Sequence, residues 1–232
     1  MKKLNTLLIL AVSIGLSACA KKGCNDVTAE NYDASAEQND GSCNFAPYIV
    51  LNGEPVVTIG TSASYIDEGA TAYNRDGSAV EIEDNAYIVT PGVAGEYNIT
   101  YTATNEYGSA SVTRKVIIEM SREDILGDWD ISSDCGFQFP IDGAKTLNAG
   151  LGNEIVDIPD FFTLVGGNAL AIVTNLEIFF PEQTIPITGG EVTFSGNGTI
   201  SGNANSMTVN FEYDNTVPLI GGSGTCTATF SR

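Results

Sequence analysis

The chain has 232 residues, with 29 acidic and 10 basic side chains, a formal net charge of −19 and no histidine. Because 43% of its residues are hydrophobic and only 17% are charged, it has enough apolar side chains to build packed domains. The negative charge argues against nucleic acid as a partner, since phosphate binding requires a basic face. The missing histidine excludes Ser-His-Asp and Cys-His catalysis and His-ligated zinc.

The amino terminus predicts an exported, lipid-anchored protein. Lys2 and Lys3 precede an apolar stretch over residues 4–16 that is too short to span a bilayer, which indicates a signal peptide over residues 1–18. The following Leu16-Ser17-Ala18-Cys19 resembles the lipobox of bacterial lipoproteins. That resemblance implies acylation of Cys19 by fatty acids such as palmitate, an anchor that needs no transmembrane helix. The alternative is a plain secreted protein in which Cys19 stands by chance.

The residues after Cys19 bear on the final location. Ala20 stands where lipoproteins retained in the inner membrane commonly have Asp, so we expect sorting to the outer membrane. The following Lys21-Lys22-Gly23 lacks the acidic run that accompanies surface export in some groups. Whether the protein faces the cell surface or the periplasm therefore stays open.

The other four cysteines predict disulfide bonds. Cys24, Cys43, Cys135 and Cys226 allow three pairings, and spacing alone selects none of them. The pairs Cys24–Cys43 and Cys135–Cys226 are favoured because each brackets one compositional unit. An oxidising compartment makes free thiols the weaker alternative.

Residues 19–46 form the first unit, a lipidated N-terminus followed by an acidic module. Gly23 to Cys43 resembles a short cysteine-bounded module found in many exported bacterial proteins. Its side chains offer oxygen atoms of the kind that calcium binds, and no other cofactor is expected. The candidate ligands are Asp26, Asn31, Asp33, Asn39 and Asp40. Because their spacing is not that of an EF-hand, the alternative is a disulfide-tied spacer without metal.

Residues 47–119 predict an antiparallel β-sandwich. Tyr97, Ile99, Tyr101 and Ala103 alternate with polar residues, which is the period of a half-buried strand. Turn dipeptides punctuate the segment at the spacing of a domain with several short strands. They are Asn52-Gly53, Asp76-Gly77, Pro91-Gly92, Ala94-Gly95 and Tyr107-Gly108.

Three stretches of this segment resemble one family. Residues 65–72, 95–108 and 114–118 resemble the bacterial Ig-like domain that also occurs in a pesticidal crystal protein, a family related to HYR-type adhesive modules. The resemblance implies a spacer or adhesion module rather than an active site. One departure is Asn105-Glu106-Tyr107-Gly108, where relatives usually have Asp and then Gly-Asn. Six acidic residues of the segment are interpreted as a solvated face and not as a metal cluster: Asp67, Glu68, Asp76, Glu81, Glu83 and Asp84.

Residues 120–232 predict a second, small β-domain, which makes the whole chain all-β. Three alternating stretches each place apolar residues on one face: Trp129, Ile131, Ser133 and Cys135; Met207, Val209, Phe211 and Tyr213; Cys226, Ala228 and Phe230. A buried Cys135–Cys226 bridge follows naturally if the first and last strands are neighbours, and neighbouring end strands mean a closed or nearly closed barrel. Gly127-x-Trp129 resembles the start of a lipocalin, with Arg232 placed to cover the tryptophan. We therefore prefer a lipocalin-like barrel; a second sandwich is the alternative.

The apolar stretch from Phe161 to Phe180 has two interpretations. The first is a pair of core strands joined by a turn at Gly166-Gly167-Asn168. The second is a set of aromatic side chains that line a cavity for an apolar or glycan ligand.

The sequence assigns no catalytic residue. It lacks Gly-x-Ser-x-Gly, Ser-x-x-Lys and Walker motifs, and no carboxylate pair stands out among its acids. The favoured interpretation is a non-catalytic outer-membrane lipoprotein that displays an Ig-like module and a terminal β-domain for adhesion or glycan binding. Its partners would be the membrane, through the lipid, and a glycan or another surface protein. The alternatives are a lipocalin-like carrier of a small apolar ligand and a carboxylate-based glycoside hydrolase.

Overall fold

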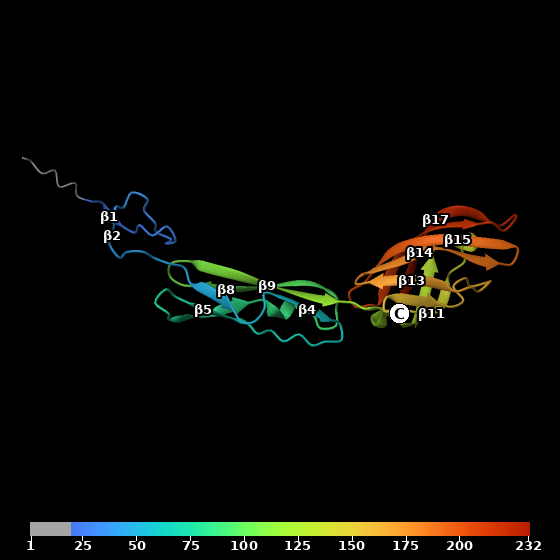
Figure 1. The fold of residues 1–232 in the computed structure, drawn as a ribbon, viewed down its shortest axis with the longest axis horizontal. Helices are drawn as coiled ribbons and strands as arrows, with labels where there is room; N and C mark the ends of the chain where they lie inside the picture. Colours follow the sequence, from blue (N-terminus) through green and yellow to red (C-terminus); the bar gives the residue numbers. More distant parts are fainter. Residues whose placement is uncertain (1–19) are drawn as a thin grey trace, which may run out of the picture. The chain divides into compact units, whose positions relative to one another are not determined.

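The computed structural model describes residues 20–232, so the expected signal peptide and the lipidation site Cys19 lie outside the described residues. The described chain consists of β-strands with three short 3₁₀ turns (Figure 1). Over this range, no helix has the length and apolar character needed to cross a membrane. By its contacts the chain divides into two compact units. One contains the described residues up to Tyr48 with Ala72–Glu81 and Ala103–Ala110; the other contains Ile49–Thr71, Ile82–Thr102 and Ser111–Arg232.

The amino-terminal module is a small loop structure closed by a disulfide. Two short strands, β1 (Lys22–Gly23) and β2 (Gln38–Asn39), pair in parallel. The bond Cys24–Cys43 joins the two ends of the module, and Cys24 is buried. Because the module has almost no apolar core of its own, the disulfide and its turn hydrogen bonds hold its shape.

The central domain has two sheets. The first contains β3 (Tyr48–Leu51), β5 (Ala70–Tyr73) and β6 (Ala79–Val80). The second has the order β4 (Val56–Gly60), β9 (Ser109–Glu119), β8 (Gly95–Thr104) and β7 (Ile82–Asp84), with the 3₁₀ turn η1 (Ala86–Ile88) after β7. The edge strand β4 runs parallel to β9. This is the predicted Ig-like sandwich, except that the pairing of β4 with β9 is parallel, whereas the sequence predicts an antiparallel sandwich.

The core of the sandwich follows the predicted alternation on β8. Ile99, Tyr101 and Ala103 are buried, whereas Glu96 and Asn98 on the same strand are exposed. Side chains of both sheets pack around these residues, which accounts for the period of two in the sequence. The main apolar residues around them are Ile49, Leu51, Ile59, Ile82, Val112, Val116 and Ile118.

The carboxyl-terminal domain is a closed barrel of eight antiparallel strands, each paired with its neighbour in the chain (Figure 1). The strands are β10 (Gly127–Ser133), β11 (Gly143–Ala149), β12 (Ile155–Ile158), β13 (Ala169–Thr174), β14 (Glu177–Ile187), β15 (Gly190–Ile200), β16 (Ser206–Asn215) and β17 (Gly222–Ser231). The 3₁₀ turn η2 (Arg122–Ile125) precedes the barrel, and η3 (Gly136–Gln138) follows β10. The last strand closes on the first, with Ile131 opposite Phe230. The barrel prediction is thus confirmed, and the second sandwich is wrong.

The stretch from Phe161 to Phe180 differs from its prediction in the place of the turn. β13 and β14 are joined at Asn175-Leu176, with Thr174 opposite Glu177 and Asn175 at a φ of 53°. Asparagine tolerates this left-handed conformation, so a two-residue hairpin forms without glycine. Gly166 and Gly167 instead lie in a loop that folds Phe161 and Phe162 into the barrel.

Candidate functional site

The three aspartates of the amino-terminal module each bind a nearby hydroxyl and backbone amide. Asp26 accepts hydrogen bonds from Thr28 N and Oγ1 at 3.0 and 2.7 Å. Asp33 and Asp40 form the same arrangement with the serines two residues further along the chain. These bonds lower the pKa of Asp26 and Asp40, and in Asp33 a hydrogen bond from Lys21 is the largest cause of the lowering.

The two candidate asparagines, Asn31 and Asn39, also form hydrogen bonds within the module. Asn31 donates to Ser42 O at 2.7 Å and accepts from Asn44 N at 2.8 Å. Asn39 accepts from Gly41 N at 2.8 Å. Each of the five candidate calcium ligands thus accepts at least one hydrogen bond from the protein, and within residues 20–232 the three aspartates do not gather as a metal-sized group. Calcium binding by this module stays a prediction, with titration calorimetry as its test.

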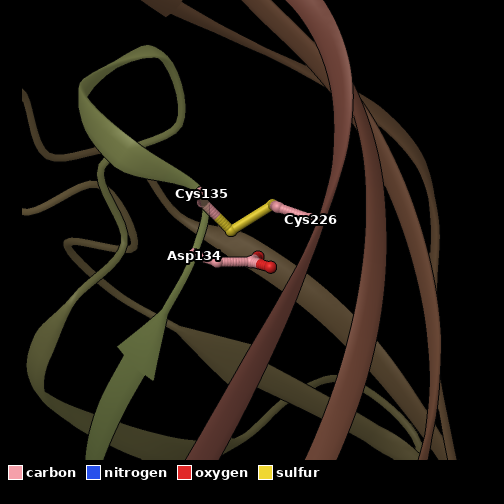
Figure 2. A group of neighbouring side chains, drawn as sticks. All are labelled: Asp134, Cys135 and Cys226. Carbon is pink, nitrogen blue, oxygen red and sulfur yellow. A yellow bond between two sulfur atoms is a disulfide. The ribbon is translucent and has the colours of Figure 1, made fainter.

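A metal-sized group of side chains does occur at the end of the barrel, but it is a disulfide site. Asp134, Cys135 and Cys226 place their ligand atoms within 4.8 Å of one another. Figure 2 shows the two sulfur atoms bonded to each other, with the carboxylate beside them. The sulfurs are therefore not free to bind a metal, and Asp134 accepts a hydrogen bond from Thr227 N at 2.6 Å. The disulfide links β17 to the segment that directly follows β10, as the favoured cysteine pairing predicts.

Arg232 covers Trp129, as the sequence analysis predicts. The guanidinium of Arg232 lies 4.5 Å from the ring centre of Trp129. Arg232 donates to Leu126 O at 3.1 Å, and the indole of Trp129 donates to Ile125 O at 2.8 Å. These contacts attach the turn before the barrel to its first and last strands.

Side chains fill the barrel interior. Seven aromatic rings form a contiguous cluster: Phe139, Phe161, Phe162, Phe180, Phe194, Phe211 and Tyr213. Their neighbouring centroids lie between 4.9 and 6.3 Å apart, the range of favourable ring packing. The cavity-lining interpretation placed several of these rings around a ligand, whereas in the structure they contact one another. Phe179 is the exception, because it points outward.

A buried lysine that the sequence analysis missed lies at one mouth of the barrel. Lys145 on β11 is buried and donates to Asp160 O at 2.9 Å and Thr163 Oγ1 at 3.2 Å. Burial lowers the pKa of Lys145, and the nearby Asp160 and Asp142 oppose that effect. Since both of its acceptors lie in the loop that carries Phe161 and Phe162, Lys145 holds this loop over the barrel. The signal available in the sequence was its position two residues before Leu147, which places both side chains on the same face of a strand.

A buried ion pair inside the sandwich corrects the interpretation of Asp67. Arg114 on β9 is only 1% exposed and pairs with Asp67, which also accepts hydrogen bonds from Tyr101 at 2.6 Å and Tyr65 at 2.9 Å. Asp67 therefore belongs to the structural interior, because a buried guanidinium requires a counter-charge. The other five acidic residues of the proposed solvated face are exposed, as expected.

A cavity of about 520 Å³ lies within the compact unit that contains the amino-terminal module. It is lined by Cys43, Phe45, Asn74, Arg75, Asp76, Asn105, Glu106 and Tyr107. Arg75 stacks on Phe45 at 4.2 Å and lies 3.5 Å from Asp26, so its charge already has partners. The pKa of Asp76 is lowered by hydrogen bonds from Ser78, which is opposite to the shift that a catalytic acid needs.

A second cavity, of about 410 Å³, lies on the outer face of the barrel, where β14, β15 and β16 run side by side. We call it the outer groove. Its lining residues are Glu177, Ile178, Phe179, Asn197, Gly198, Thr199, Thr208 and Asn210. It combines one exposed aromatic ring with amides, hydroxyls and a carboxylate, all on strands.

The comparisons with known proteins bear on the sandwich. No curated protein matches the chain. Among solved structures, the chain is similar to the crystal structure of the lipoprotein BT2262 from Bacteroides thetaiotaomicron, with 13% identity over 80% of this chain and 100% of that chain; the TM-score of 0.30 is too low to support an argument. Residues 49–118, which coincide with the two-sheet domain, match the family model described as "Bacterial surface protein, Ig-like domain".

Proposed function

We propose that this protein is a non-catalytic binding protein of the bacterial cell envelope, anchored by acylated Cys19 and active through its outer surfaces. The observation that carries the proposal is the filled barrel. Because seven aromatic rings occupy its interior, the ligand contacts of this domain are left to the outside.

The envelope location rests on two independent features. The lipobox-like Leu16-Ser17-Ala18-Cys19 supports a lipid anchor, and Ala20 supports sorting to the outer membrane. The match of residues 49–118 to an Ig-like domain of bacterial surface proteins supports display outside the cell. Within that broad class, we infer the subtype related to the pesticidal crystal protein and HYR-type modules. In this proposal the sandwich holds the barrel away from the membrane for adhesion or glycan binding.

Acylation and display are tested in intact cells. We expect the mature wild-type protein to start at Cys19 with fatty-acyl chains in its mass spectrum and to be released from washed cells by protease. The matched variant Cys19→Ser should lose the acyl chains and enter the soluble fraction. A wild-type protein that is secreted without acyl groups would refute the anchor, and protection from protease would place the barrel in the periplasm.

The binding mode is tested with detergent-solubilised full-length protein. We expect retention on immobilised glycans and no displacement of a fluorescent fatty acid or of an apolar dye. Saturable uptake of such a probe by the barrel would favour the carrier alternative instead. Release of reducing sugar from the bound glycan would favour the glycoside hydrolase.

A further inference from the structure

We propose that the outer groove on β14–β16 binds a neutral oligosaccharide, with Phe179 as the stacking platform. This inference rests on the proposed function and names its site and its ligand class. It begins from the side chain of Phe179, which is 48% exposed near the start of β14, where this strand pairs with β13 on one side and β15 on the other.

The strand register places polar side chains next to this ring in two rows. In the first row, Phe179 on β14 lies opposite Asn197 on β15, which lies opposite Asn210 on β16. In the second row, the same strands align Glu177, Thr199 and Thr208. Since side chains at paired positions share one face of a sheet, all six project into the groove.

This combination fits a sugar better than an apolar ligand or a protein. A pyranose has C–H groups on its faces, which pack on an aromatic ring, and hydroxyls around its rim, which need hydrogen-bond donors and acceptors. The two amides and the two threonines supply both kinds of group. Phe179 is the one large apolar side chain that the groove exposes, because Ile178 points into the barrel core, and a single ring is too little for the core of a stable protein interface.

The charge of the groove favours a neutral sugar. Its lining contains Glu177 and no lysine or arginine, on a chain with a net charge of −19. An acidic polysaccharide would therefore be repelled by the groove and by the protein as a whole. A carboxylate can instead accept two hydroxyl hydrogen bonds from a neutral sugar.

The groove is held in one shape before any ligand arrives. Its residues stand on long paired strands, and Asn210 Oδ1 already accepts a hydrogen bond from Thr227 at 2.8 Å on the next strand. Adjacent strands are about 4.8 Å apart, so three of them span about 10 Å, which suits a short oligosaccharide segment. A preformed site avoids the entropy loss of ordering loops on binding.

The experiment uses detergent-solubilised full-length protein, with binding to neutral and acidic polysaccharides measured by affinity electrophoresis. We expect Phe179→Ala to weaken binding of a neutral polysaccharide about tenfold or more, and Asn197→Ala to weaken it to a smaller extent. The matched control is Phe137→Ala, which removes another exposed ring of the barrel, 68% exposed and outside the groove. It should bind as the wild type does. Both phenylalanine variants should unfold at the wild-type temperature, because neither ring is in the core.

The outcomes separate this inference from the proposed function. Neutral polysaccharide bound equally by wild type and Phe179→Ala would overturn the groove as the site and leave glycan binding standing. Binding confined to acidic polysaccharides would overturn the ligand class. No glycan binding by the wild type would overturn the glycan inference, whereas surface display and adhesion to another protein would still be tested by the cell assays.

Discussion

Removing the barrel disulfide tests how the eight-stranded ring is kept closed. The Cys135–Cys226 bond joins residues that are 91 positions apart in the chain. In the chain-entropy model, closing a loop of this length restricts the unfolded state enough to stabilise the fold by about 4–5 kcal/mol. We therefore expect the double variant Cys135→Ala/Cys226→Ala to lose about that much free energy of unfolding.

The measurement is urea and thermal unfolding followed by tryptophan fluorescence. Trp129 is the single tryptophan of the chain and is buried in the barrel, so the signal reports this domain. For a domain of about 100 residues, 1 kcal/mol shifts the melting temperature by about 4–8 °C. The double variant should thus unfold about 15 °C or more below the wild type, with a similar urea dependence.

The control removes the other disulfide. Cys24→Ala/Cys43→Ala opens a bond with a sequence separation of 19 in the amino-terminal module, and the fluorescence transition should stay within about 1 °C of the wild type. A loss below about 1 kcal/mol in the barrel variant would refute the reasoning. It would mean that the hydrogen bonds and packing between β10 and β17 hold the barrel closed, and that the disulfide adds little to its free energy of unfolding.

Four further substitutions test the interiors of the two domains. Arg114→Met should cost about 3–5 kcal/mol in equilibrium unfolding, because it leaves Asp67 partly buried without its counter-charge; a loss under 1 kcal/mol would contradict this. Partial burial raises the pKa of Asp67, but hydrogen bonds from two tyrosines and the contact with Arg114 outweigh it and leave the pKa low. The stabilisation that ionised Asp67 provides is therefore complete above the unfolded-state pKa of about 3.9, and it is lost as the pH falls through the lower folded-state pKa. The unfolding midpoint of wild type should thus fall more steeply with decreasing pH than that of Asp67→Asn, which a pH series of unfolding curves measures. Gly196→Ala would place a methyl group 2.6 Å from the ring of Phe211 and should cost about 1–3 kcal/mol by urea unfolding, and an unchanged midpoint would show that the ring cluster is loose. Phe211→Ala should cost about 3–5 kcal/mol, and a smaller loss would indicate that the cluster is not the core of the barrel.

Periodicity and cysteine spacing predicted most of the fold. The alternation around Ile99 and around Val209 placed the buried faces correctly, because each strand has one face in a core. The favoured Cys135–Cys226 pair was consistent with a closed barrel, in which the first and last strands are neighbours, and the structure confirms both the pair and the neighbouring strands.

The misplaced features depend on contacts that local sequence does not encode. The turn was predicted at Gly166 and Gly167 because glycine is the commonest turn residue, whereas the hairpin forms at Asn175 and contains no glycine. Asp67 lies in the interior because it pairs with Arg114, which is 47 positions away in the chain. No periodic pattern shows such a pairing.

The candidate site was the least predictable part. Phe179 lies between Ile178 and Phe180, and a run of three apolar residues does not show which of them points outward. The polar neighbours of Phe179 come from two other strands, so the groove exists only once the register is set.

The filled barrel has a consequence for how this protein can diversify. Residues that determine folding point inward, while those that would touch a ligand point outward from the same strands. Outward substitutions on β14–β16 can therefore alter what is recognised at little cost in stability. The β14–β15 turn at residues 188–189 and the β16–β17 connection at residues 216–221 contain no groove-lining residue, so they are suitable places to graft tags or receive insertions while recognition is preserved.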